Sequence, residues 1–103
     1  MDVLVRIKRL VLAGQVLFTA KAEAEMVADA LTQAQVYEAI VNAPAVYKIL
    51  RSRRAGHRDD ILYVIKGLTF DGMVLYTKGK ILKRESREVF YVLISSKRAS
   101  FDG

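Results

Sequence analysis

The sequence of 103 residues contains no cysteine, no tryptophan, one proline and one histidine. Without cysteine, the chain forms no disulfide, no thiolate metal site and no cysteine nucleophile, which is compatible with the reducing cytoplasm, where we expect it. The single histidine, His57, excludes a ribonuclease mechanism that uses two histidines within one chain. Because His57 stands among arginines in a charged loop, we interpret it as a solvated residue.

Long apolar runs and cofactor motifs are absent as well. No apolar stretch approaches the roughly 20 residues of a membrane span, and the first residues carry charges at Asp2 and Arg6 instead of a leader pattern. There is no glycine-rich phosphate loop and no histidine cluster, so we expect no metal and no cofactor. The 52% hydrophobic content predicts a single domain over residues 1–103, without a membrane partner.

Positive charge is concentrated in one half of the chain. The formal net charge is +6; residues 1–46 carry four Lys and Arg against five Asp and Glu, whereas residues 47–103 carry thirteen against six. A basic half is compatible with an anionic partner, which would be RNA, DNA or an acidic protein. It is equally compatible with a strongly solvated surface.

The first half of the sequence has a helical period and the second half a strand period. Helices are predicted over residues 3–13, over residues 20–30 and from Thr32 to Pro44, with Gly14 as a C-cap, Thr19 and Thr32 as N-caps, and an extended connector over residues 15–18. Strands are predicted over residues 46–50, 61–66, 73–81 and 89–98, with Gly79 at a bulge or bend. The expected fold is therefore α+β, with two to three N-terminal helices packed on one face of a small twisted antiparallel sheet.

The last predicted strand is apolar on both of its alternating sides, which indicates an inner strand covered on both faces. Simple alternation places Ser95 and Lys97 on the same side as Leu93. Lys48, Tyr76 and Lys97 lie on three different predicted strands, and they form a functional cluster only if the strand register brings their sides together. Otherwise they are ordinary edge lysines and a half-buried tyrosine.

Four segments resemble one known family. They are Ile7-Lys-Arg-Leu-Val-Leu-Ala-Gly-Gln-Val16, Ala39-Ile-Val-Asn-Ala-Pro-Ala-Val-Tyr-Lys48, Asp71-Gly-Met-Val-Leu-Tyr76 and Val92-Leu-Ile-Ser-Ser-Lys97. In this order they are similar to the motility quorum-sensing regulator (MqsR) toxins, a RelE-like group of bacterial messenger-RNA endonucleases, and to a related group of uncharacterised domains. The resemblance implies a RelE-like fold and places the family's catalytic residues on Lys48, Tyr76 and Lys97. Where the family has a strand glutamine, this sequence has Tyr63.

The activity implied by the resemblance is metal-independent cleavage of single-stranded messenger RNA. The ribose 2′-hydroxyl supplies the nucleophile, so the enzyme needs a base, cations for the phosphate and an acid for the 5′-oxygen. We assign Lys48 or Lys97 as the base, because a lysine near other cations releases its proton more readily. Tyr76 serves as the acid or as a positioning group. The expected substrate-binding residues are Arg51, Tyr63, Lys78 and Arg98.

The resemblance also implies a partner. Toxins of this family pair with an antitoxin that carries a zinc-ribbon module and a helix-turn-helix, so the protein is expected to be the toxin of a type II toxin–antitoxin system. Two alternatives stay open. The same basic surface would suit a non-catalytic module that binds RNA or an acidic protein, or a subunit whose basic face is permanently covered.

Overall fold

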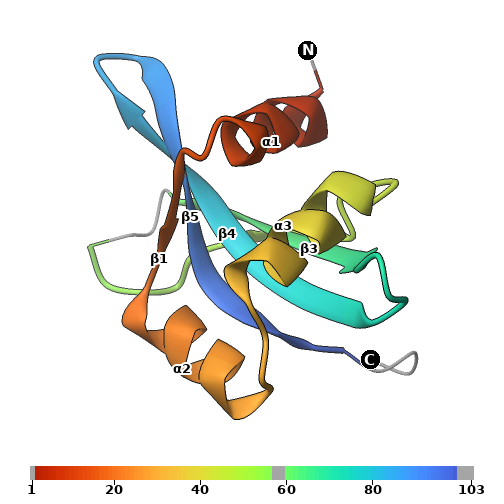
Figure 1. Ribbon diagram of the computed structural model, residues 1–103. Coiled ribbons are helices and arrows are strands. Elements are labelled where there is room, and N and C mark those ends of the chain that lie inside the picture. Colours follow the sequence, from red (N-terminus) through yellow and green to blue (C-terminus); the bar gives the residue numbers. More distant parts are fainter. Residues whose placement is uncertain (1, 57–59, 100–103) are drawn as a thin grey trace.

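The helices form where a capping residue precedes a segment with buried apolar side chains. The computed structural model describes residues 2–56 and 60–99, so the interpretation of His57 lies outside the described residues. Helices α1 (Val3–Leu12), α2 (Ala20–Ala28) and α3 (Gln33–Asn42) confirm the three predicted helices (Figure 1). Their N-cap side chains, Asp2, Thr19 and Thr32, each accept a hydrogen bond from a backbone N–H of the first turn. Gly14 follows α1 with a φ of 73°, a conformation that favours glycine.

Five strands form one sheet in the order β1-β5-β4-β3-β2. Their bounds are β1 (Val16–Phe18), β2 (Lys48–Arg51), β3 (Ile61–Leu68), β4 (Val74–Arg84) and β5 (Arg87–Arg98). The α+β class is confirmed, but the sheet is mixed instead of antiparallel, because β1 pairs parallel with β5. The connector predicted over residues 15–18 therefore contains a strand, because its backbone forms hydrogen bonds with the edge of β5 that faces away from β4.

One face of the sheet carries the hydrophobic core. Helices α1 and α3 lie over this face (Figure 1), and Ile7 and Ile40 are completely buried there with Leu75 and Leu93. Helix α3 crosses β3 in close contact, because a Cβ atom at Gly67 would lie 1.8 Å from the Ala39 carbonyl oxygen. This face is called the helix face below.

Helix α2 covers the edge of β5 beyond the end of β1. The Thr19 backbone N–H donates to the Leu93 carbonyl oxygen. The Glu25 carboxylate accepts from the Ser96 backbone N–H (3.1 Å), and the Asp29 carboxylate accepts from the Arg98 backbone N–H (2.8 Å). Two acidic side chains of the helix therefore replace the backbone acceptors of a neighbouring strand.

A β-bulge in β5 changes which side its last residues occupy. Leu93 lies opposite Gly79 and Ser95 lies opposite Lys78, so Ile94 has no partner on β4. One inserted residue reverses the alternation beyond it. Ser95 and Lys97 therefore share a side with Lys78, and the expectation that they lie on the side of Leu93 is wrong.

The opposite face of the sheet is called the open face below, and no helix of residues 2–56 and 60–99 packs over it (Figure 1). On this face Phe90, Val92 and Ile94 are only partly buried, whereas Tyr91 and Leu93 on the helix face are fully buried. The expectation of an inner strand covered on both sides is therefore wrong for the open face. β5 is an inner strand, between β1 and β4, as predicted.

Candidate nucleic-acid interface on the open face

The strand register brings lysines and tyrosines together across the open face. Tyr76 on β4 lies directly opposite Lys66 on β3 and directly opposite Lys97 on β5. The Lys97 Nζ atom lies 5.3 Å from the centre of the Tyr76 ring, and the Lys66 Nζ atom lies 4.2 Å from the centre of the Tyr47 ring. These are favourable distances for a cation against an aromatic face. We call the set the lysine–tyrosine row: Lys48, Tyr47, Lys66, Tyr76 and Lys97.

Lys48 lies on β2, in register with Lys78 and two positions along the strands from the line of Lys66, Tyr76 and Lys97. It lies opposite Val64 on β3, and its Nζ atom is 5.7 Å from the centre of the Tyr47 ring. Neighbouring strands are spaced by about 4.8 Å, so β2 and β5 lie about 14 Å apart across the sheet. Lys48 and Lys97 are therefore placed to contact different phosphates of an extended strand.

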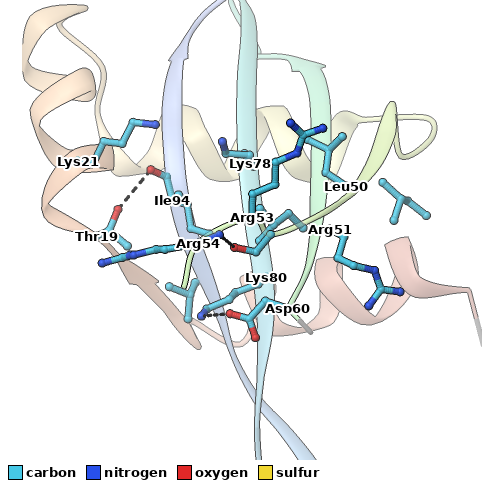
Figure 2. A pocket seen from close by; sticks show the side chains of 14 residues that line it. Thr19, Lys21, Leu50, Arg51, Arg53, Arg54, Asp60, Lys78, Lys80 and Ile94 are labelled. Carbon is cyan, nitrogen blue, oxygen red and sulfur yellow. Dashed lines mark hydrogen bonds and ion pairs between the residues drawn. The ribbon is translucent and has the colours of Figure 1, made fainter. Parts of the chain in front are cut away.

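A groove of about 990 Å³ adjoins the row on the open face (Figure 2). Side chains of β3, β4 and β5 form its floor, the start of α2 forms one wall, and β2 with the residues after it forms the other. We call it the basic groove, and its described lining residues are Thr19, Lys21, Ile49, Leu50, Arg51, Ser52, Arg53, Arg54, Asp60, Leu62, Lys78, Lys80, Val92 and Ile94.

Positive charge dominates this groove. Six lining residues are Lys or Arg, and Asp60 is the one acid among the lining residues that the structure describes. Asp60 pairs with Lys80, with 2.8 Å between Nζ and Oδ2. Lys78 forms no ion pair with any described residue, and it lies two positions from Tyr76 on the same side of β4. The groove and the row therefore form one continuous basic surface.

Glu25 brings a carboxylate to the β5 end of the row. Its Oε1 atom accepts hydrogen bonds from the Ser95 hydroxyl (2.6 Å) and from the Ser96 backbone N–H (3.1 Å). Burial raises the pKa of Tyr76, and the negative charge of Glu25 raises it further. The Tyr76 phenol therefore stays protonated at neutral pH and can donate a hydrogen bond or a proton.

Two of the predicted substrate-binding residues do not join this surface. Tyr63 lies opposite Gly79 and packs against the core on the helix face. Arg98 is held at the end of α2, where its Nε atom donates to the Asp29 carbonyl oxygen (3.2 Å), a favourable place for a cation at a helix C-terminus. The other two, Arg51 and Lys78, line the basic groove.

Sequence reasoning missed Lys66, Tyr47 and Glu25 as members of the site. Lys66 faces Tyr76 because of the register of the β3–β4 hairpin, which the turn over residues 69–72 fixes. Tyr47 directly precedes Lys48 in the sequence. An aromatic residue next to a cation is a pattern typical of single-stranded nucleic-acid binding, and it could have indicated Tyr47. Glu25 gave no signal, because its proximity to Ser95 arises only when α2 packs along β5.

No family model, no curated protein and no solved structure matched this chain when each was searched. Within residues 2–56 and 60–99, no three side chains of His, Asp or Glu come together in a way that could hold a metal ion. In the same part of the chain, every helix is too short or too polar to cross a lipid bilayer.

Proposed function

We propose that the chain is an endoribonuclease that binds single-stranded RNA across the open face and cleaves it at the lysine–tyrosine row. The observation that carries this proposal is the alternation of cations and aromatic rings across four neighbouring strands, on a face that no helix of the described residues covers. The basic groove beside the row adds further cations that suit a phosphate backbone.

Single-stranded RNA suits this surface better than a duplex. Its bases can be splayed out and stacked on aromatic rings, whereas the narrow major groove of a double helix hides them. The Tyr47 side chain is 58% exposed, so part of its ring is available to a base. Lys48 and Lys66, which lie within 5.7 Å of the centre of this ring, are placed to hold the phosphates of the neighbouring nucleotides.

The residues of the row supply most of the chemistry of 2′-hydroxyl attack. Lys66 and Lys97 flank Tyr76 and stabilise the negative charge that develops on the phosphate oxygens. The protonated Tyr76 phenol gives its proton to the 5′-oxygen as the P–O bond breaks. The products are a 2′,3′-cyclic phosphate and a 5′-hydroxyl, and no metal ion takes part in this scheme.

The proposed biological role is the toxin of a type II toxin–antitoxin system, acting on messenger RNA in the cytoplasm. It rests on the resemblance of four sequence segments to the MqsR family, which includes Lys48, Tyr76 and Lys97 in matching order. The proposed partner is a cognate antitoxin with a zinc-ribbon and helix-turn-helix architecture. Any zinc would then belong to the partner.

One observation favours a second candidate, which is a non-catalytic module that binds an acidic protein. The described lining of the basic groove contains no aromatic residue, and its floor includes the aliphatic side chains of Leu62, Val92 and Ile94. An aliphatic floor with a basic rim suits an amphipathic acidic segment, whereas RNA bases prefer aromatic stacking partners.

The test is incubation of the purified chain with a defined single-stranded messenger RNA in EDTA, followed by mapping of the product ends. We expect cleavage that leaves 2′,3′-cyclic phosphates, and a loss of at least about 100-fold in rate for Lys97→Ala with RNA binding retained. Lys83→Ala is the matched control, because Lys83 is an exposed lysine near the β4–β5 turn. If wild type binds RNA without cleaving it, also when ribosomes are added, the binding module replaces the nuclease.

A further inference from the structure

We propose that Glu25 is the general base of this site, in place of Lys48 or Lys97. This inference rests on the proposed endoribonuclease activity. It starts from the position of the Glu25 carboxylate, which α2 places at the β5 end of the lysine–tyrosine row.

The two oxygens of this carboxylate have different surroundings. The Ser95 hydroxyl and the Ser96 backbone N–H both donate to Oε1. Among the described residues, none donates a hydrogen bond to Oε2. One oxygen is therefore held in place by two donors, and the other has its lone pairs available to accept a proton. The residue is partly exposed, so a substrate can reach it.

The same two serines tie Glu25 to the reacting region. Ser95 lies opposite Lys78 on the open face, and Ser96 directly precedes Lys97, which lies opposite Tyr76. The charge of Glu25 acts on the Tyr76 phenol and contributes to its raised pKa. A phosphate between Lys97 and Lys66 would thus have a proton acceptor and a protonated phenol nearby. Two other titratable groups lie at this edge: the Asp29 carboxylate, which accepts from the Arg98 backbone N–H, and Lys21, which lines the groove with Ile94.

The proton balance of the reaction is complete with these groups. Glu25 takes the proton of the ribose 2′-hydroxyl while the 2′-oxygen forms a bond to phosphorus. The bond between phosphorus and the 5′-oxygen breaks, and the leaving oxygen takes the proton of Tyr76. Transfer of one proton from Glu25 to the Tyr76 phenolate, directly or through water, restores both groups.

Glu25 also has a structural role, because it replaces a strand acceptor at the edge of β5. The substitution Glu25→Gln separates the two roles. The amide oxygen of Gln can still accept from Ser95 and Ser96, but the amide does not take up a proton at neutral pH. Glu25→Asp keeps the carboxylate on a shorter side chain. Glu23→Gln is the matched control on α2, since Glu23 is exposed on the same helix.

The experiment measures kcat/KM for RNA cleavage from pH 4 to pH 9, RNA affinity, and Tm for wild type and the three variants. We expect Glu25→Gln to lose at least about 100-fold in kcat/KM, to keep its RNA affinity and Tm, and to lack the acidic limb of the pH profile. Glu25→Asp should keep measurable cleavage together with that limb. Glu23→Gln should match wild type.

Two results would overturn the inference while leaving the nuclease in place. One is cleavage by Glu25→Gln within about threefold of wild type and with an unchanged pH profile. The other is an equal loss in Glu25→Gln and Glu25→Asp that follows a lowered Tm, which would make Glu25 a structural residue only. An inactive wild type, by contrast, would refute the proposed function itself.

Discussion

Lys97 faces Tyr76 on the open side of the sheet, with its Nζ atom 5.3 Å from the ring centre, because Ile94 has no partner on β4. In a regular strand, Lys97 would follow Leu93 onto the helix face. A single inserted residue therefore decides whether the terminal lysine of β5 belongs to the candidate site. Bulges commonly re-aim side chains next to functional sites in this way.

Lys78 is expected to contribute a phosphate contact. Because it lies in the basic groove without an ion pair to any described residue, Lys78→Ala should weaken RNA binding similarly for all sequences. The slope of log K against log salt concentration should become shallower by about one contact. Fluorescence anisotropy titrations from 50 to 300 mM salt measure this slope. An unchanged slope in Lys78→Ala, equal to that of Lys83→Ala, would place the RNA outside the groove.

Tyr76→Phe removes the proposed acid and keeps the aromatic ring. Cleavage should fall by about 100-fold to 10,000-fold, while RNA affinity should stay within about twofold of wild type. Because burial and Glu25 raise the pKa of the phenol, the protonated form persists to higher pH than for an ordinary tyrosine. Wild-type activity should therefore hold up to about pH 10 and fall only above it. A parallel loss of cleavage and binding would make the Tyr76 hydroxyl an RNA-binding group instead of the acid.

Gly79→Ala should destabilise the fold, since Gly79 lies under a buried ring. A Cβ atom at this position would lie 2.5 Å from the Cζ atom of Tyr91, which is completely buried. We expect a loss of about 1–3 kcal/mol in the free energy of unfolding, measured by urea denaturation. In a double-mutant cycle, Tyr91→Leu should reduce this loss, because the smaller side chain leaves room for the methyl group. Strictly additive effects would contradict the proposed clash.

Tyr91→Phe should stabilise the protein. The Tyr91 hydroxyl is buried and has no hydrogen-bond partner among the described residues, a situation that costs about 1–3 kcal/mol. Burial, reinforced by Tyr63, raises the pKa of this phenol in the folded state.

The raised pKa of Tyr91 makes the stability of the folded protein depend on pH. The folded-state pKa lies above the unfolded value of about 10, so above pH 10 the unfolded chain releases the proton more readily and stability falls. Urea denaturation at pH 7 and pH 10.5 should show a larger advantage of Tyr91→Phe at the higher pH. If the stability difference between Tyr91→Phe and wild type is the same at both pH values, the Tyr91 hydroxyl ionises as readily in the folded protein as in the unfolded chain.

The resemblance to the MqsR family and the catalytic residues placed by it stay predictions, since no searched protein or structure matched the chain. What the structure adds is geometric. It places Lys48, Tyr76 and Lys97 on the open face, with Lys97 opposite Tyr76 and Lys48 in register with Lys78, and it places Tyr63 on the other face and Arg98 at the end of α2.

The sequence by itself determined the local elements. Thr19 and Thr32 cap their helices, Gly14 ends the first helix, and alternating apolar residues define the long strands. These features depend on neighbours within a few positions, and hydrogen bonding and side-chain periodicity act over that range. The α+β class followed from the order of these elements.

Only the tertiary structure decided the composition of the site. The parallel pairing of β1, the unpaired Ile94 and the approach of Glu25 to Ser95 each depend on contacts between distant segments. A change of one residue in register exchanges the two faces of a strand at little local cost, so local sequence cannot fix it. The packing of α1 and α3 on one face selects the register, because the apolar residues of β5 must meet these helices.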